Sequence, residues 1–279
     1  MTRVAALVVT HNSTLWIEET LASIAAQTKQ PDTIVVIDDA STDGTPELVA
    51  ELLGARGFVI PSTAASEDRI TRIASNFRQG VQACTDAEII VLGDHDDIWH
   101  PDRIDHQAGL IVADPTVSMV ASDGRLVDMD GVPSGGTLRG TFPVRAGFND
   151  MSPAEKMSAV LRRSVATGGA SALRRAAFTD VYIPDGWLHD RWWSLVAAAR
   201  EQLFVDDATV IDYRISAGQE VGLDTGLQEH ANLARLMAGV SSVRTSMSKM
   251  DDIRQRLAPF ATEATAPELT GPRLLRNLM

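Results

Sequence analysis

Short apolar runs alternate with amphipathic segments over the first 113 residues, and the two kinds of segment differ in periodicity. The apolar runs are typical of buried strands, and they span residues 4–9, 34–37, 58–60 and 88–92. Apolar residues recur at helical spacing in the segments 17–25, 46–53, 73–83 and 104–111. This alternating order predicts an α/β fold, with a mostly parallel central sheet that is joined by right-handed crossovers and flanked by helices.

The second half of the chain has a weaker pattern, in which turn signals separate shorter segments. Asp123-Gly124 and Asp130-Gly131 are typical of turns, so we expect separate strands at 117–122 and 125–128. Glycine and proline are frequent in residues 132–150, which predicts a long irregular segment of the kind that forms a lid or binding loop. The remaining pattern indicates helices at 154–161 and 187–199 and strands at 167–173, 203–205 and 210–213.

The C-terminal region carries an amphipathic stripe. Apolar side chains recur every three or four residues at Leu236, Val240, Val243, Met247, Met250 and Leu257. We expect this stripe to pack on the rest of the protein, and a homodimer through the C-terminal helix is the alternative. The chain is therefore interpreted as one α/β domain over residues 1–225 with a helical extension over residues 226–279.

The charge of the chain excludes one class of partner. Its 279 residues carry a formal net charge of −12, whereas a nucleic-acid partner requires a dense basic surface. No apolar run reaches the roughly 20 residues that span a bilayer, and the N-terminus lacks the pattern of a signal peptide. We therefore expect a cytoplasmic protein with no transmembrane segment, for which peripheral membrane contact stays open. The single cysteine, Cys84, excludes an internal disulfide.

Two acidic loops mark the candidate site. Asp94, Asp96 and Asp97 follow the strand at 88–92, and Asp39 follows the strand at 34–37. Ligands bind beyond the carboxyl ends of such parallel strands. Crowded carboxylates are costly to desolvate unless a cation compensates their negative charge. An Asp-x-Asp pair suits Mg²⁺ or Mn²⁺, which keeps coordination positions open for diphosphate oxygens. We therefore expect the ligand to be a nucleoside diphosphate derivative.

Three motifs in order resemble the signatures of the family 2 glycosyltransferases, whose fold is GT-A. They are Val-Val-Thr-His-Asn at 8–12, Val-Ile-Asp-Asp-Ala-Ser-Thr-Asp-Gly-Thr at 36–45 and Asp-His-Asp-Asp-Ile-Trp-His-Pro-Asp-Arg-Ile at 94–104. The third motif is most similar to the rhamnosyltransferase-like branch, and the resemblance covers roughly residues 3–222. It implies a nucleotide-sugar-binding half over about residues 1–122 and an acceptor-binding half over about residues 123–225.

The resemblance also implies roles for residues of the first half. The nucleotide is bordered by Thr10 and Asn12, its base or ribose is contacted by Asp39, and its ribose and metal-bound diphosphate are held by Asp94 and Asp96. Mn²⁺ or Mg²⁺ is the implied cofactor. For Asp97, a direct metal role and capping or dipole compensation of the following helix both stay open.

Other polar residues of the first half are interpreted as structural. Asp38 is expected to satisfy neighbouring backbone groups, and Asp43 suits a turn before the helix at 46–53. Three arginines, Arg69, Arg72 and Arg78, lie near the segment that borders the nucleotide in relatives. A solvated helix face is the favoured interpretation of each, and contact of one of them with a phosphate or the base is the alternative.

Two segments of the second half resemble the acceptor side of the family. Thr-Gly-Gly-Ala-Ser-Ala-Leu at 167–173 resembles its small-residue acceptor strand, which includes Gly168 and Gly169. Trp-Leu-His-Asp-Arg-Trp-Trp at 187–193 resembles its His-Asp-Trp-Trp segment. The match implies that Asp190 is the general base and that His189 and Trp192 line the acceptor site. Core packing is the competing interpretation of both aromatic rings.

The end of the last predicted strand departs from the family pattern. Relatives have Tyr-Arg-x-His there, and the histidine completes the metal site, whereas this chain has Ser216 in its place. The resemblance makes Arg214 a partner of the diphosphate. A water, Gln219 or a nearby histidine then fills the metal position, or the dependence on metal is weak.

The residues and the resemblance together predict an inverting glycosyltransferase. It would move a sugar from a nucleotide-diphosphate donor to a hydroxyl of a sugar, glycolipid or natural-product acceptor by a single displacement. One alternative is a catalytically silent subunit that binds the nucleotide sugar. A sugar-nucleotide pyrophosphorylase is less favoured, because no glycine-rich phosphate loop with a following arginine lies near the N-terminus.

Overall fold

The computed structural model describes residues 2–215 and 251–278. Its strands are β1 (Val4–Thr10), β2 (Thr33–Asp38), β3 (Gly57–Pro61), β4 (Ile89–Asp94), β5 (Ile98–Trp99), β6 (Met119–Val127), β7 (Pro133–Thr137), β8 (Ser171–Arg174) and β9 (Leu203–Arg214). Its helices are α1 (Ile17–Ala25), α2 (Thr45–Leu53), α3 (Arg69–Ala83), α4 (Arg103–Ala113), α5 (Leu138–Thr141), α6 (Pro153–Arg162), α7 (Arg175–Phe178), α8 (His189–Ala199) and α11 (Gly271–Leu278). Residues 251–257 are also helical.

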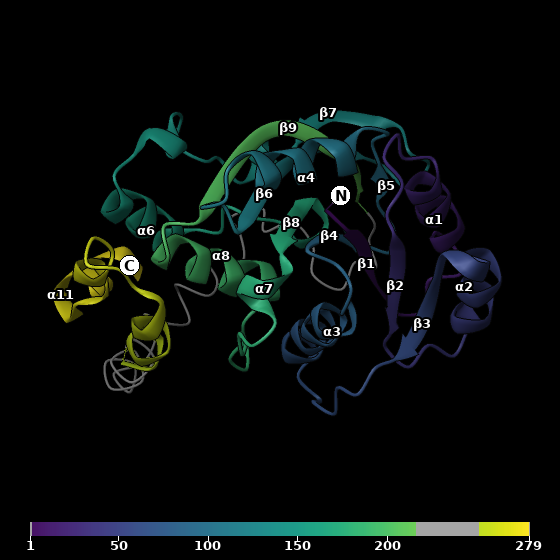
Figure 1. Cartoon of the computed structure of the whole chain (residues 1–279), viewed down its shortest axis with the longest axis horizontal. Helices are drawn as coiled ribbons and strands as arrows, with labels where there is room; N and C mark the ends of the chain where they lie inside the picture. Colours follow the sequence, from purple (N-terminus) through teal and green to yellow (C-terminus); the bar gives the residue numbers. More distant parts are fainter. Residues whose placement is uncertain (1, 216–250, 279) are drawn as a thin grey trace.

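The described strands form one sheet in the order β3-β2-β1-β4-β8-β6-β9-β5, and β7 pairs with β6 (Figure 1). β3, β2, β1 and β4 run parallel to one another. β8 is antiparallel to both of its neighbours, β4 and β6, whereas β6 and β9 are parallel. Because β8 is reversed, its first residues lie at the same edge of the sheet as the last residues of β1, β2, β4, β6 and β9. That edge carries the candidate site.

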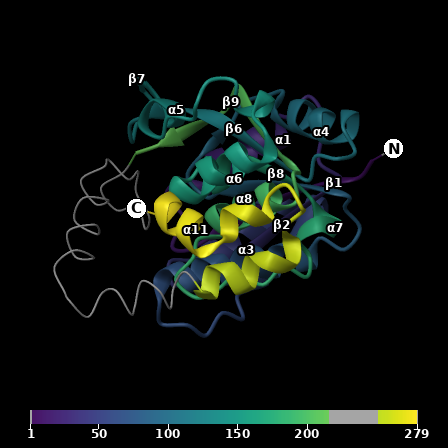
Figure 2. The ribbon, with the colours of Figure 1, turned by 90° about the vertical axis from the view of Figure 1, so that its left-hand side faces the viewer.

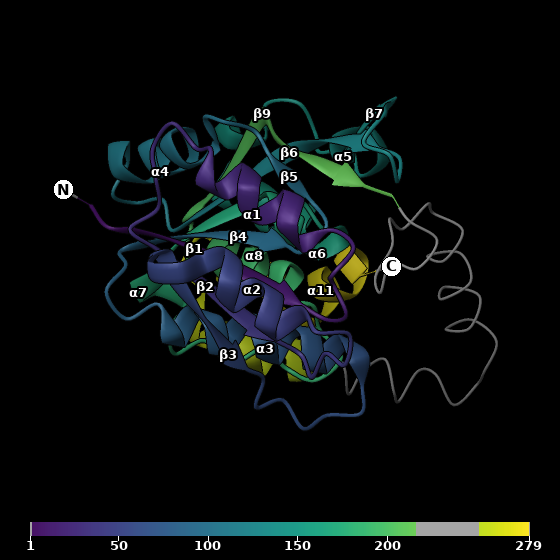
Figure 3. The ribbon, with the colours of Figure 1, turned by 90° about the vertical axis from the view of Figure 1, so that its right-hand side faces the viewer.

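Helices cover both faces of the sheet. On one face lie α1, α2 and α4 (Figure 3), whose buried residues, such as Ile17 and Ile104, share a core cluster with Val8 of β1. On the other face lie α3, α6 and α8 (Figure 2), and residues such as Trp193 share a second cluster with Leu7 of β1. Successive side chains of β1 therefore enter opposite layers, as expected for a central strand that is buried on both faces.

The predicted α/β fold with a parallel central sheet flanked by helices is confirmed, and the elements predicted in the first 113 residues are present. The predicted turn at Asp123-Gly124 is wrong, because both residues lie within β6, whose register against β9 shifts there. A Cβ on Gly124 would meet side-chain atoms of Leu138 and Ile211 at 2.8 and 2.9 Å. Close packing, and not a turn, requires glycine at this position.

Three other segments of the second half differ from the prediction. The strands predicted at 203–205 and 210–213 are one continuous strand, β9. The strand predicted at 167–173 begins as a 3₁₀ turn over Gly168–Ala170 and continues as β8. The segment 132–150 is not wholly irregular, because it contains β7, α5 and a short 3₁₀ turn.

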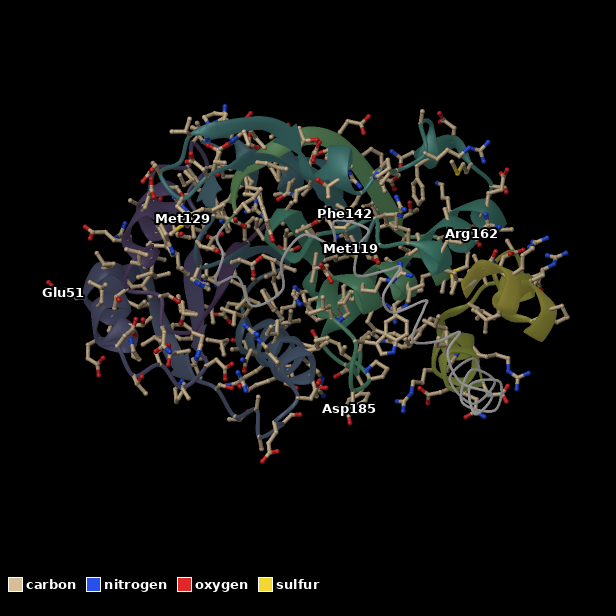
Figure 4. The ribbon with its side chains drawn as sticks, turned by 180° about the vertical axis from the view of Figure 1, so that it is seen from behind. Glu51, Met119, Met129, Phe142, Arg162 and Asp185 are labelled. Atoms are coloured by element: carbon tan, nitrogen blue, oxygen red, sulfur yellow. The ribbon has the colours of Figure 1, made fainter. Side chains whose placement is uncertain are left out.

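Residues 251–278 pack against α6. Leu257 and Leu274 are buried in the same core cluster as Trp193. Asn277 Oδ1 accepts a hydrogen bond from Ser158 Oγ at 2.8 Å, and Arg162 of α6 lies beside this segment (Figure 4). The rest of the predicted stripe, from 236 to 250, and the boundary at 225 lie outside the described residues, so the helical extension and the dimer stay predictions. Among the described residues, no helix combines the length and apolar character needed to cross a membrane.

Candidate active site

The loops after β1 and β2 are joined to each other by side-chain hydrogen bonds. Asp38 accepts hydrogen bonds from Thr10 Oγ1 at 3.0 Å, from Ser41 Oγ at 2.6 Å and from Ser41 N at 3.0 Å. Asn12 has a φ of 48°, and its Oδ1 accepts from Thr42 N at 2.9 Å. The structural role predicted for Asp38 is confirmed, and Thr10 supports the loop through it. The nucleotide contacts of Thr10 and Asn12 stay predictions.

Asp43 also has the structural role that was predicted for it. Its carboxylate accepts hydrogen bonds from the backbone N–H and the hydroxyl of both Thr14 and Thr45. Burial acts to raise the pKa of Asp43, but these hydrogen bonds lower it to about 2. Gly44 follows with a φ of 88° and allows the sharp entry into α2.

Asp39 pairs with an arginine of α3. Its Oδ2 accepts from Arg72 Nε at 2.7 Å, and only 7% of the Asp39 side chain is exposed. The interpretation of Arg72 as part of a solvated helix face is therefore wrong, because it carries a positive charge to the edge of the sheet. Asp39 also donates its backbone N–H to Thr10 O at 2.8 Å, which places its carboxylate beside the end of β1.

Asp94 and Asp97 converge on Gly169, which begins the chain segment that leads into β8. A Cβ at Gly169 would overlap Asp97 Oδ2 and would lie 2.9 Å from Asp94 Oδ2. The backbone N–H of Gly169 favours the ionised form of Asp94 and so acts to lower its pKa. Asp97 is fully buried, its Oδ1 accepts from Arg214 N at 3.4 Å, and its Oδ2 has no protein partner.

The crowding of these acids changes their ionisation. Burial, reinforced by the neighbouring carboxylates of Asp96 and Asp190, raises the pKa of Asp94 to about 7. Burial and the same kind of repulsion, from Asp96 and Asp94, raise the pKa of Asp97 well above its usual range. Asp97 does not cap α4, which begins at Arg103 with Asp102 as its N-terminal flanking residue, so the capping interpretation is wrong.

A buried arginine lies behind the acids. Arg103 is fully buried, and its guanidinium carbon lies 3.9 Å from the centroid of the Trp99 ring. Burial lowers the pKa of Arg103 to about 9, against the attraction of Asp97 and Asp94. Arg103 therefore remains a cation at neutral pH and partly compensates the two carboxylates.

Asp190 lies at the start of α8 and faces the same segment from the other side. Its Oδ2 accepts from Gly168 N at 3.0 Å, and its Oδ1 accepts from Arg191 N at 2.6 Å. Burial raises the pKa of Asp190 to about 6, although both hydrogen bonds favour the carboxylate. Asp190 interacts electrostatically with Asp94, so the structure brings the predicted base and the predicted donor acid together.

The two aromatic residues predicted for the acceptor site are buried. His189 is 4% exposed, its ring stacks on Phe77 with centroids 3.6 Å apart, and both of its ring nitrogens lack protein partners. Burial lowers the pKa of His189 to about 3, so the ring is neutral. Trp192 is 1% exposed and meets Trp187 edge-on at 5.2 Å. Their contact with an acceptor stays a prediction, and both rings form part of the core described here.

Arg214 is enclosed by protein groups. Its side chain donates to Asp96 O at 3.1 Å, to Met129 O at 2.6 Å and to Glu19 Oε2 at 2.6 Å, and it lies over the Trp16 ring. The residue is 2% exposed, so the diphosphate contact predicted for it requires some of these bonds to break. Ser216 and Gln219, which bear on the missing histidine, lie outside the described residues.

The acidic loop fits a divalent cation. Within residues 2–215 and 251–278, no three His, Cys, Asp or Glu side chains are arranged as a complete metal site. The loop instead supplies hard oxygen donors, one of which is the buried and unpartnered Oδ2 of Asp97. Mg²⁺ and Mn²⁺ are commonly held by one or two carboxylates together with substrate phosphates, so such an incomplete donor set suits them.

A comparison with protein families decides how this geometry is interpreted. The model of glycosyl transferase family 2 matches residues 5–181, which include both acidic loops and the Gly168-Gly169 segment. The chain belongs to glycosyl transferase family 2. Membership places it among the glycosyltransferases, enzymes of class EC 2.4. No curated protein matches the chain by sequence.

Solved structures of similar fold include other glycosyltransferases. The chain aligns with Staphylococcus aureus TarS in complex with UDP at a TM-score of 0.54 and 19% identity, over 77% of this chain and 61% of that one. It aligns with the mannosyltransferase PcManGT of Pyrobaculum calidifontis, in complex with GDP-Man and Mn²⁺, at a TM-score of 0.56 and 21% identity, over 98% and 68% of the two chains. Glucosyl-3-phosphoglycerate synthase of Mycobacterium tuberculosis, in complex with Mn²⁺, UDP and glucosyl-3-phosphoglycerate, aligns at 0.52 and 18%, over 88% and 79%. This chain spans less than two thirds of the TarS chain, and the likenesses show a common fold.

Two arginines of this family 2 site were not identified from the sequence as partners of the acidic residues. Arg72 pairs with Asp39 across 33 positions, and the sequence offers no local signal for that pair. Arg103 stands in the third motif, seven positions after Asp96. The position of Arg103, after the acidic loop and before the apolar face of the next helix, was the one signal that it could be a buried counter-ion of these acids.

Proposed function

We propose that the protein is an inverting glycosyltransferase that uses a nucleoside diphosphate sugar. The observation that carries the proposal is that Asp94 and Asp190 meet at two consecutive residues. Asp190 accepts a hydrogen bond from Gly168 N, and a Cβ on Gly169 would lie 2.9 Å from Asp94 Oδ2. A single displacement needs a base beside the acceptor hydroxyl and groups that hold the donor diphosphate, all within reach of one carbon atom.

Asp190 is proposed as the general base. Its carboxylate removes the proton of the acceptor hydroxyl while the oxygen forms a bond to the anomeric carbon. The bond from that carbon to the leaving diphosphate breaks on the opposite face and takes its electron pair with it, so the configuration inverts. Two amide N–H groups keep Asp190 oriented for this task.

The donor side is proposed to use Asp39, Asp94 and Asp96. Asp96 and Asp94 would hold Mn²⁺ or Mg²⁺, and Asp39 would meet the base or ribose. When bound, the cation supplies electrostatic stabilisation to the departing diphosphate. The sequence Asp-His-Asp-Asp-Ile-Trp supports a place in the rhamnosyltransferase-like branch, and a sugar, glycolipid or natural product is the proposed acceptor.

A panel of nucleotide sugars tests the donor assignment. UDP-, GDP- and dTDP-sugars, including 6-deoxyhexose donors, are added to the protein with and without Mn²⁺, and the melting temperature is measured. A donor present at about 100 times its Kd raises the free energy of unfolding by about 2.7 kcal/mol, which we expect for one nucleotide class in the presence of Mn²⁺. An unchanged melting temperature with every nucleotide under both conditions would contradict the proposed donor site.

The proposed base predicts the pH dependence of the reaction. The active form of Asp190 is the carboxylate, and burial raises its pKa to about 6, so activity is lost as the pH falls through that value. With Mn²⁺ in excess, so that the bound cation keeps Asp94 ionised, we expect kcat/KM to be about tenfold lower at pH 5 than at pH 7 and to level off above pH 7. Initial rates measured between pH 5 and pH 9 provide the check. A rate that falls between pH 6 and pH 8 would contradict a carboxylate base.

A further inference from the structure

Two polar side chains on one face of α4 are completely buried beneath the acidic loop. Arg103 and Gln107 are four positions apart and are both 0% exposed. α4 packs against β4 and against β8, the strands that carry Asp94 and continue from the glycine segment (Figure 1). Most buried polar atoms are hydrogen-bonded, so the partners of these two side chains show what they hold.

Arg103 connects the helix to the strand of the donor acids. Its Nη2 donates to Leu92 O at 2.6 Å, two residues before Asp94, and its Nε donates to Gln107 Oε1 at 3.1 Å. The same Nη2 lies 3.5 Å from Ser171 O, the first residue of β8. One guanidinium therefore links three elements at the active edge while its charge faces Asp97 and Asp94.

Gln107 extends this connection to the glycine segment. Its Nε2 donates to Ala170 O at 2.9 Å and to Ser122 Oγ at 2.9 Å. Ala170 directly follows Gly168, whose N–H donates to Asp190, and Gly169, at which a Cβ would lie 2.9 Å from Asp94 Oδ2. Neither side chain hydrogen-bonds to Asp94 or Asp190, yet both hold the backbone beside which these two acids lie.

We propose that Arg103 and Gln107 are positioning residues for sugar transfer, because they fix the Gly168-Gly169 amides between the donor acids and the base. The proposal rests on the proposed function. We call the hydrogen bonds of Arg103 and Gln107 to Leu92 O and Ala170 O the clamp. A displacement of about 1 Å at a reacting group can lower a rate by about 100-fold, so loss of the clamp should change kcat more than donor binding.

Hydrogen exchange of the glycine segment tests the clamp without any substrate. In Gln107→Met, which keeps the side-chain length and removes the donation to Ala170 O, we expect the amides in a peptide covering residues 166–172 to exchange at least about tenfold faster. The readout is amide deuteration of the full chain by mass spectrometry. Arg103→Lys keeps the positive charge but loses the planar guanidinium group and its several N–H donors. We therefore expect a smaller increase in the exchange rate, of about threefold or more.

Kinetics test the positioning role. For Gln107→Met we expect kcat to fall by about 10- to 100-fold while KM for the donor stays within about threefold. Arg174→Met is the matched control, because Arg174 also lies on β8 and donates to two carbonyls, Ile111 O at 2.7 Å and Val117 O at 3.3 Å, at the end of β8 away from the acids. The control should lower the melting temperature and leave exchange in 166–172 and kcat unchanged.

The outcomes separate this proposal from the proposed function. Unchanged exchange in Gln107→Met, faster exchange with an unchanged kcat, or an equal loss of kcat in Arg174→Met would each overturn the clamp. If Gln107→Met does not fold, Arg103→Lys is judged by the same measures. A wild-type protein that transfers no sugar from any donor would overturn the proposed function, and the exchange measurement would still decide whether the clamp exists.

Discussion

Replacement of Asp190 by asparagine is expected to lower kcat by about 10²- to 10⁴-fold, which is the contribution typical of a positioned general base. The amide has nearly the same shape, but it cannot remove a proton. Its oxygen can still accept the hydrogen bond from Gly168 N, which spans 3.0 Å in the wild type, so the glycine segment should keep its place. The affinity for UDP or GDP with Mn²⁺, measured by calorimetry, should stay within about threefold of the wild type, because the substitution removes no interaction with the bound nucleotide.

The matched control for Asp190→Asn is Asp185→Asn. Asp185 stands five residues earlier on the same stretch, is exposed (Figure 4), and accepts a hydrogen bond from Tyr182 Oη at 3.1 Å. Its replacement should leave kcat unchanged. An Asp190→Asn protein that keeps more than about a tenth of the wild-type kcat would contradict the proposed base. A loss of nucleotide affinity as large as the loss of kcat would instead assign Asp190 to donor binding.

Replacement of Gly169 by alanine is expected to cost both stability and activity. The added methyl group would overlap Asp97 Oδ2 and lie 2.9 Å from Asp94 Oδ2, and Asp97 is fully buried. Overpacking of this kind destabilises a protein by about 1–3 kcal/mol. Because one of the crowded oxygens belongs to Asp94 of the proposed donor site, we also expect a loss of about 100-fold in kcat/KM. Urea unfolding and initial rates measure the two effects.

Gly109→Ala controls for the loss of a glycine as such. Gly109 lies within α4, and a Cβ there would meet no atom within 4 Å. Alanine is favoured over glycine in a helix, so this variant should gain about 0.5–1 kcal/mol of stability and keep full activity. If Gly169→Ala were as stable and as active as Gly109→Ala, the convergence of the two acids on residue 169 would be contradicted.

The parallel half of the fold was predictable because its signals are local. Residues 4–10 and 89–94 are short apolar runs that end in polar loops, and the structure has β1 and β4 there. The same property explains the error at Asp123-Gly124. This dipeptide is a common turn signal, but here the packing of Leu138 and Ile211 against Gly124 excludes any side chain, a tertiary cause that local sequence does not contain.

The site was predictable only for residues that stand in motifs. Asp39 and Asp94 were singled out by their place in acidic loops that follow two strands, and Asp190 by resemblance. The structure brings Asp94 and Asp190 to one segment. The pairing of Arg72 with Asp39 and the donation of Gln107 to Ala170 O, across 63 positions, depend on how helices dock on the sheet. The burial of Arg214 likewise depends on Glu19, a residue 195 positions away, so no spacing rule could reveal it.

The reversal of β8 has a consequence for how the two reactants would be brought together. Because β8 runs against β4, it is the beginning of this segment, and not its end, that meets the acids, and it offers them two successive amides. Consecutive Cα atoms lie about 3.8 Å apart across a trans peptide. Gly168, which donates to Asp190, and Gly169, which lies against Asp94, are neighbours in the chain, so a shift of this short segment would move the surroundings of both acids together.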